Sequence, residues 1–239
     1  MASIKKICII TNFRCASTAF NLLKAEEYGV PYKGELFSHE KTFDIGNTDK
    51  FKKFSGTRTN ENFYAELKNN ESVECCFKIM PVHTQYDVDF LIDIAKATDK
   101  VYYLYRRDFL SQLTSYIAIR AYGNAQKTGF RTNVGFNQRE ERARQLVLGT
   151  LGEEKTYELE MSLKDRELNG LHGNIGVKML RRQLIRNYEV MAEAYKIFPG
   201  ELICKEDYFT EEKYKPYNRK VTWNEDPNFE DFDVEGLFI

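Results

Sequence analysis

The sequence predicts an α/β protein in which helices cover both faces of a central parallel sheet, a three-layer α/β/α arrangement. Short apolar segments alternate along the chain with longer segments in which apolar residues recur every three or four positions, the pattern of βαβ units. The short segments are apolar on both faces, as expected of strands buried between two layers of helices. The 239 residues are enough for one such domain with a sizeable core.

The predicted elements follow one another in the order of repeated βαβ units. The strand-like segments are residues 6–10, 73–80, 101–105 and 201–204. The helical patterns cover residues 17–28, 60–68, 86–98, 109–120, 138–148 and 177–198. The last of these carries one apolar stripe, made of Val177, Leu180, Leu184, Tyr188, Met191 and Tyr195. Glycines stop the first and the last helix, at Gly29 and Gly200.

The alternation of strands and helices is interrupted once. Residues 121–176 are rich in Gly, Asn, Arg and Glu, and their one helical pattern is strongly charged. No internal repeat or low-complexity tract occurs, so we expect a single domain over residues 1–239. We interpret residues 121–176 as a cap insertion of helix and loop over the carboxyl ends of the strands, the edge at which open α/β sheets bind ligands.

The overall composition excludes several classes of protein. Lys and Arg number 35 and Asp and Glu 36, a balance that argues against a general nucleic-acid binder. No apolar stretch reaches the roughly 18 residues of a membrane helix, and the amino-terminal apolar run is too short for a signal peptide. Ala2 stands where myristoylation needs glycine. We therefore predict a soluble cytoplasmic protein without nucleic-acid or membrane partners.

The cysteines and histidines suggest no metal site and no disulfide framework. The five cysteines are odd in number and contain no CxxC pair, so we expect free thiols, most of them buried. They are Cys8, Cys15, Cys75, Cys76 and Cys204. The histidines show no ligand spacing either; they are His39, His83 and His172.

The first strand leads into a turn with the character of an anion-binding site. Arg14 is followed by Cys15, Ala16, Ser17 and Thr18, where a helix begins. Free backbone N–H groups and the positive end of the helix dipole favour an anion there, while hydroxyl and guanidinium groups add donors. The alternative is an ordinary turn capped by Ser17 or Thr18. The GxxxxGK pattern of a nucleotide-binding loop is absent.

A second strand, turn and helix contains another arginine. Arg106 and Arg107 end the strand at 101–105, and Asp108 is a suitable N-cap for the helix that follows. Ser115 lies eight residues after Arg107, two turns into that helix. The alternative is that Arg107 pairs with a carboxylate and Ser115 is an ordinary residue of the helix face.

Together these two segments resemble the sulfotransferase family that uses 3′-phosphoadenosine 5′-phosphosulfate. Residues 13–18 correspond to its first motif, PRSGTT or PKSGTT, with Phe13 in place of Pro and Ala16 in place of Gly. Arg107-Asp108 with Ser115 corresponds to its second motif. The resemblance implies a P-loop NTPase-like sulfotransferase fold. It also implies that residues 14–18 hold the 5′ phosphosulfate and that Arg107 and Ser115 hold the 3′ phosphate.

The same resemblance suggests residues for the chemical step. Glu35 in Gly34-Glu35-Leu36-Phe37 matches the carboxylate base of some members, and His39 is a second candidate. Lys78 matches the lysine of a KTHLP-like segment, with Met80 in the place of its histidine. A lysine at a strand end can reach the sulfuryl group or the acceptor, or it can form a salt bridge at the sheet edge.

Two further segments complete the comparison with that family, and His83 is considered with them. Glu206 and Asp207, in LICKEDYF, match a later strand and its acidic turn. Arg219 and Lys220, in NRKVTW, resemble the basic carboxyl-terminal segment that reaches the 3′ phosphate. His83 is expected to be structural or to line the acceptor pocket.

The resulting hypothesis is transfer of a sulfuryl group to a hydroxyl or amine of a small-molecule, glycan or peptide acceptor. Such a reaction needs a general base for the acceptor's proton and positive groups at the transferring oxygens. It requires no metal ion. Two alternatives remain open: a P-loop small-molecule kinase, and a non-catalytic module with a degenerate sulfotransferase fold.

Overall fold

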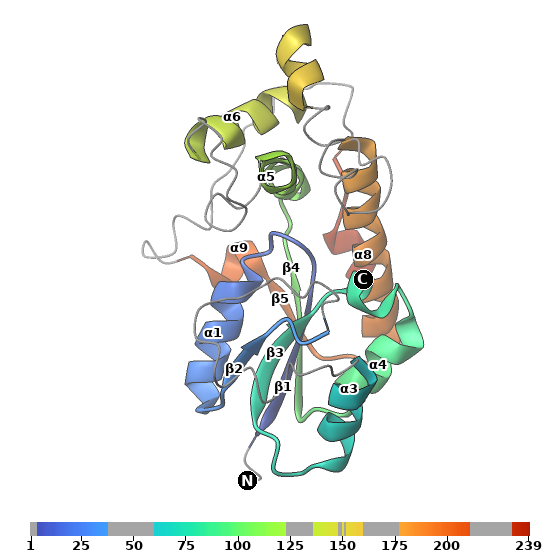
Figure 1. Ribbon diagram of the computed structural model, residues 1–239. Coiled ribbons are helices and arrows are strands. Elements are labelled where there is room, and N and C mark those ends of the chain that lie inside the picture. Colours follow the sequence, from blue (N-terminus) through green and yellow to red (C-terminus); the bar gives the residue numbers. More distant parts are fainter. Residues whose placement is uncertain are drawn as a thin grey trace. The chain divides into compact units, whose positions relative to one another are not determined.

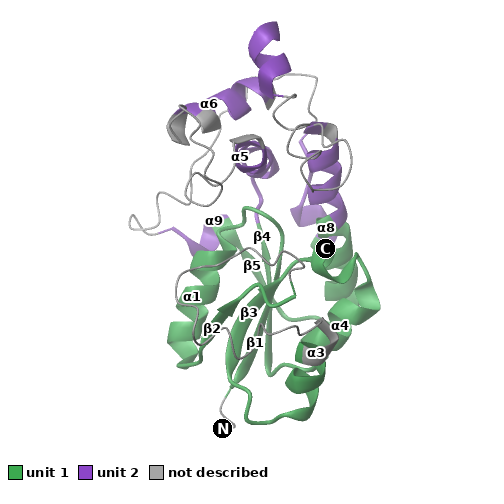
Figure 2. Ribbon diagram, viewed as in Figure 1, with its two compact units in different colours: residues 1–105, 187–205, 238 green, residues 106–186, 206–237, 239 purple. Residues whose placement is uncertain are grey.

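The computed structural model describes residues 4–37, 60–122, 136–147, 150, 152–159, 177–210 and 231–239. The chain divides into two compact units (Figure 2). Unit 1 comprises residues 1–105, 187–205 and 238, and unit 2 comprises residues 106–186, 206–237 and 239. Unit 1 holds the sheet, and unit 2 includes the stretch 121–176 that was expected to form a cap. His39, Arg219 and Lys220 lie outside the described residues.

A five-stranded sheet forms the centre of unit 1 and confirms the predicted α/β class. Its strands pair in parallel throughout, in the order β2-β3-β1-β4-β5. They are β1 (Lys6–Thr11), β2 (Tyr32–Gly34), β3 (Cys75–Ile79), β4 (Lys100–Tyr105) and β5 (Glu201–Cys204). Every residue of β1 and β3 is buried, which confirms that the apolar runs are strands covered on both faces.

Helices lie on both sides of this sheet, so unit 1 is compatible with a three-layer arrangement. Figure 1 shows α1 (Ser17–Tyr28) on one side and α3 (Asn60–Asn69) and α4 (Val88–Lys96) on the other. Phe20 of α1 packs edge-on against Tyr102 of β4, with ring centroids 5.5 Å apart. On the opposite face, Phe77 of β3 contacts Phe37 and Phe63. Side chains of β3 therefore alternate between two helical layers, as the period of a strand requires.

The strand order defines where a ligand is expected. The chain leaves β1 through α1 toward β2, whereas it leaves β4 on the side of β5. Because β1 and β4 are neighbours, their connections diverge at the carboxyl ends of these two strands. Open α/β sheets bind ligands at such a point. The turn at residues 12–16 begins there, directly after β1.

Unit 2 consists of helices in its described residues. They are α5 (Phe109–Tyr122), α6 (Phe136–Val147), a helical stretch at 153–159, the first part of α8 (Val177–Ile197), most of α9 (Lys205–Tyr208) and η3 (Glu235–Phe238). The predicted N-cap of α5 is confirmed, since Asp108 Oδ1 accepts a hydrogen bond from the Ser111 N–H at 2.9 Å. None of the helices in the described ranges combines the length and the apolar character needed to cross a membrane.

The sequence missed the short elements and misjudged some boundaries. The three-residue strand β2 and the short helices η1 (Pro81–Thr84) and α9 were not predicted. The helix predicted at 86–98 begins only at Val88, because Gln85 and Tyr86 have left-handed backbones and Asp87 is the N-cap. Asp87 Oδ1 accepts the Phe90 N–H at 2.9 Å, which fixes that start.

Candidate active site

The turn after β1 has the backbone conformation of an anion-binding loop. Arg14 and Ala16 have positive φ angles of 61° and 55°, and no positive φ is found at Cys15 between them. Left-handed residues next to right-handed ones can turn successive N–H groups toward one point, a nest that binds anions, so the two positive φ angles make this turn a candidate for such a site. Position 16 thus has the conformation for which the sulfotransferase motif carries glycine, and alanine adopts it at a cost of about 1 kcal/mol.

The side chains of this turn differ from an ordinary helix cap. Ala16 is the N-cap of α1 and forms no side-chain cap bond, so the alternative of a cap by Ser17 or Thr18 is wrong. Cys15 points into the core, where its thiol lies 3.4 Å from the Tyr188 hydroxyl. Only the backbone of residue 15 therefore remains for a ligand. Arg14 is exposed and Ser17 is buried at the start of α1.

A lysine from the neighbouring strand joins this turn to the carboxylate that the sequence singled out. Lys78 Nζ donates to Thr18 Oγ1 at 2.8 Å and to Ser17 Oγ at 3.4 Å. The same ammonium pairs with Glu35 Oε1 at 2.9 Å. The Lys78 side chain is only 8% exposed and that of Glu35 23%. Four predicted residues thus form one cluster at the amino end of α1.

Local backbone structure brings Glu35 to this position. Strand β2 ends at Gly34, whose φ of +65° is a conformation that side-chain-bearing residues rarely adopt. The chain turns there, and Glu35 reaches Lys78 on the next strand of the sheet. Tyr32 begins β2, and burial together with the nearby Glu35 carboxylate raises the pKa of its phenol.

For His83, the sequence predicted only a structural role or a place in the acceptor pocket. It lies in η1, just after β3, and its Nε2 is 3.9 Å from Glu35 Oε2. Its Nδ1 accepts the Met80 N–H at 3.3 Å, so in the neutral ring the proton is on Nε2 and faces Glu35. Glu35 therefore lies between an ammonium and an imidazole N–H. The segment FKIMPVH carries both groups, but the η1 turn that folds His83 back was not predicted.

Buried amides connect the anion-binding turn to the turn of His83. Asn187 of α8 donates from Nδ2 to Asn12 Oδ1 at 2.9 Å and accepts the Val82 N–H on Oδ1 at 3.1 Å. Asn12 Oδ1 also accepts the Phe13 N–H at 2.8 Å. Both asparagine side chains are fully buried, so these bonds fix the two turns relative to each other. Sequence reasoning missed Asn187, although a polar residue beside an apolar stripe is a usable signal.

Two polar side chains lie buried beneath the cluster. Asn21 is one turn after Ser17 on α1, and within the described residues neither polar atom of its amide has a hydrogen-bond partner. The Tyr32 hydroxyl is also buried and finds no partner in the part of the chain that the structure describes. Cys76 of β3 is close to both residues. It pairs with Tyr32 in the sheet, and its thiol donates to the Asn21 carbonyl at 3.6 Å. The layer between α1 and β3 is thus polar well below the turn.

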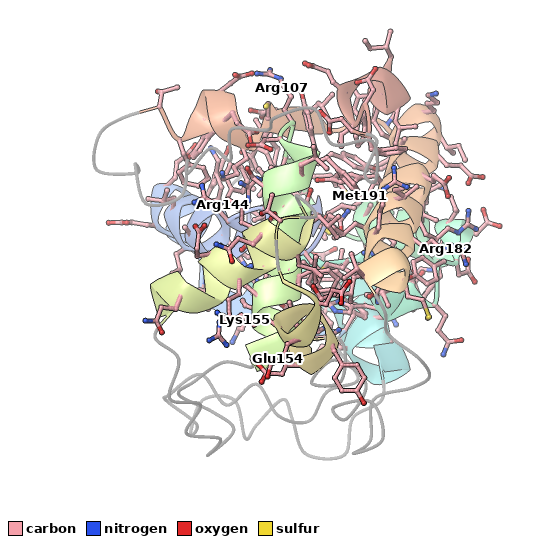
Figure 3. All side chains as sticks on the ribbon, turned by 90° about the horizontal axis from the view of Figure 1, so that it is seen from above. Arg107, Arg144, Glu154, Lys155, Arg182 and Met191 are labelled. Atoms are coloured by element: carbon pink, nitrogen blue, oxygen red, sulfur yellow. The ribbon has the colours of Figure 1, made fainter. Side chains whose placement is uncertain are left out.

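The residues of the second motif belong to unit 2. Arg107 forms ion pairs with Asp207 and Glu235, at 2.7 and 3.0 Å, and its side chain is 45% exposed (labelled in Figure 3). Ser115 is half-buried on α5. The alternative that Arg107 pairs with carboxylates therefore describes its present contacts.

A metal centre finds no support in the described residues, where no three His, Cys, Asp or Glu side chains gather into a group that could hold an ion. The described part of the chain instead contains a turn with two left-handed residues, two hydroxyls, an ammonium and a carboxylate at one end of a parallel sheet. Comparison with family models, with curated proteins and with solved structures gave no match. The assignment of function therefore depends on the chemistry of the site.

Proposed function

We propose that the protein is a sulfotransferase that takes a sulfuryl group from 3′-phosphoadenosine 5′-phosphosulfate. The observation that carries the proposal is the position of Lys78 Nζ, which contacts Thr18, Ser17 and Glu35 at the amino end of α1. An anion held by that turn lies beside a positive charge, two hydroxyls and a carboxylate. Transfer of a negatively charged group to a hydroxyl requires such a set.

The residues of the turn fit the phosphosulfate end of the co-substrate. The left-handed backbones at 14 and 16 direct N–H groups at an anion, and Thr18 is exposed enough to offer its hydroxyl. When bound, the co-substrate supplies a sulfuryl group whose S–O bond to phosphate breaks as the bond to the acceptor oxygen forms. Arg107 and Ser115 are assigned to its 3′ phosphate through the family resemblance.

Glu35 and Lys78 have complementary roles in this proposal. Glu35 accepts the acceptor's proton on the carboxylate, while Lys78 holds Oε1 and so fixes the orientation of the group. As Glu35 takes up the proton, its negative charge disappears and the ammonium of Lys78 is no longer balanced. The positive charge then acts on the oxygens of the transferring group, at the stage of the reaction that needs it. His83 is a positioning residue that faces Oε2.

A second candidate is a non-catalytic module of the same fold. Two cations of the proposed site, Lys78 and Arg107, pair with carboxylates of the chain itself. Such pairs are also what a purely structural role would produce. A P-loop kinase has less support, because the turn carries no lysine and no glycine.

Thermal unfolding with adenosine 3′,5′-bisphosphate, compared with ATP, separates these functions. A ligand at about 100 times its Kd stabilises a protein by about 2.7 kcal/mol, which raises the Tm of a chain of this size by about 5–10 °C. We expect that rise with the bisphosphate alone. A rise with ATP alone would indicate the kinase, and no rise with either nucleotide would indicate the non-catalytic module.

A further inference from the structure

Arg107 is occupied on both edges of its guanidinium group by carboxylates of unit 2. Nη1 and Nη2 donate to the two oxygens of Asp207, at 3.2 and 2.7 Å. Nε and Nη2 donate to the two oxygens of Glu235, at 3.0 and 3.5 Å. A phosphate that binds this arginine in a two-bonded manner must therefore replace one of the two carboxylates.

The two carboxylates are held in different ways. Asp207 belongs to α9, and its neighbour Glu206 accepts the backbone N–H of Arg107 at 3.0 Å, so both ends of the arginine are tied to the same short helix. Glu235 belongs to the carboxyl-terminal segment, in a turn closed by the bond from the Gly236 N–H to Asp233 Oδ1 at 2.9 Å. The shorter pair of bonds, on the Nη1–Nη2 edge, goes to Asp207.

Building on the proposed function, we propose that Glu235 occupies the place of the ligand's 3′ phosphate and that Asp207 is a positioning residue for Arg107. On binding, the phosphate exchanges with Glu235 on the Nε edge while Asp207 keeps the guanidinium in orientation. One carboxylate has to leave, because two carboxylates and a phosphate around a single guanidinium would leave excess negative charge. Both carboxylates are exposed, Asp207 at 63% and Glu235 at 47%, so both ion pairs are weak. The longer bonds to Glu235, at 3.0 and 3.5 Å, make it the partner that exchanges.

The proposal predicts opposite effects for two matched substitutions. Glu235→Gln removes the competing charge and should tighten binding of adenosine 3′,5′-bisphosphate about two- to fivefold, the range expected for an exposed ion pair. Asp207→Asn removes the same charge but also the bidentate partner, and it should weaken binding. Asp231→Asn, which removes a charge from the segment of Glu235, serves as the control and should change nothing.

Calorimetric titration of the full chain and these variants with two nucleotides provides the test. The gain in Glu235→Gln should appear with adenosine 3′,5′-bisphosphate and be absent with adenosine 5′-phosphate, which lacks the 3′ phosphate. Equal gains in Glu235→Gln and Asp231→Asn, or a gain in Asp207→Asn, would indicate only a general charge effect and overturn the assignment.

The same titration keeps this inference separate from the proposed function. If the parent protein binds the bisphosphate more tightly than adenosine 5′-phosphate, and Glu235→Gln leaves that preference unchanged, the exchange is wrong and the proposed function stands. If neither the parent nor any variant binds the bisphosphate, the proposed function fails and the inference fails with it.

Discussion

Lys78 in unit 1 and Arg107 in unit 2 both pair with carboxylates, but their surroundings differ. The Lys78 side chain is 8% exposed and also holds two hydroxyls, whereas Arg107 is 45% exposed and its partners Asp207 and Glu235 are still more accessible. Solvent and salt screen the second cluster far more than the first. An ion pair of the same kind therefore holds its side chains firmly where it is buried and only weakly where it is exposed.

The largest expected effect tests whether the buried cluster performs chemistry. Glu35→Gln keeps the shape of the side chain and removes the base, so turnover should fall by about 10²–10⁴ while bisphosphate affinity stays within a few-fold. A panel of phenols, alcohols and amines first identifies an acceptor for the parent protein, and the same preparation is titrated with the bisphosphate. Glu27→Gln, which changes an exposed carboxylate paired with the buried Lys24, is the control.

One outcome would transfer the role of base to a histidine. If Glu35→Gln retains turnover while His39→Ala or His83→Ala abolishes it, the assignment of Glu35 is wrong. His83 is a concrete candidate for this role, because its Nε2 lies 3.9 Å from Glu35 Oε2.

The second effect concerns stability. Lys78→Met leaves Glu35 and two hydroxyls without their cation, and we expect a loss of about 3 kcal/mol in the free energy of unfolding, the lower end for a buried pair because Glu35 keeps some contact with water. Urea unfolding measures it. Lys100→Met breaks the more exposed pair with Glu201 and should cost less than about 1 kcal/mol. Equal losses would show that burial does not distinguish the clusters.

The third effect concerns the exposed cluster. Arg107→Ala should weaken binding of adenosine 3′,5′-bisphosphate about tenfold or more and that of adenosine 5′-phosphate far less, because a charge-assisted bond to the 3′ phosphate is lost. Arg144→Ala, which removes an exposed arginine paired with Glu141, is the control (Figure 3). Parallel losses for the two nucleotides would refute the contact with the 3′ phosphate.

The last effect concerns the titration of two buried thiols on β3, the strand that also carries Lys78. Burial raises the pKa of Cys75 and Cys76 from 9.0 to about 12. Their thiols thus stabilise the fold fully below pH 9, and this contribution is lost as the pH rises toward 12, because the unfolded chain releases the protons first. Unfolding free energies should fall by about 1 kcal/mol per pH unit for each thiol. Cys76→Ala should flatten this slope; an unchanged slope would contradict the assignment.

Regular elements with strong patterns were predictable, and contacts made through short turns were not. The helix at Ser17–Tyr28 followed from its helical pattern and the central strands from short, continuously apolar runs, and both signals reflect burial directly. For the positive φ at Ala16, the only sequence signal was that the motif has Gly at this position. The approach of His83 to Glu35 depends on β2 and η1, which are too short for periodicity to reveal. The carboxylates on Arg107 come from residues about a hundred positions away in sequence, and no local pattern encodes such a pairing.

The pairing of β4 with β5 has a consequence for the order in which the chain folds. Tyr105 pairs with Cys204, so the outer strand of the sheet is supplied only after all of residues 106–186 have been made. During synthesis on the ribosome, β1, β3 and β4 are present long before β5 and the Asn187 amide that ties the two turns together. Parallel pairings over such separations are slow to form, because a long loop must close before any contact repays its entropy. The emerging chain therefore carries an open edge on β4, which can pair wrongly with other strands, until β5 (Glu201–Cys204) has been made.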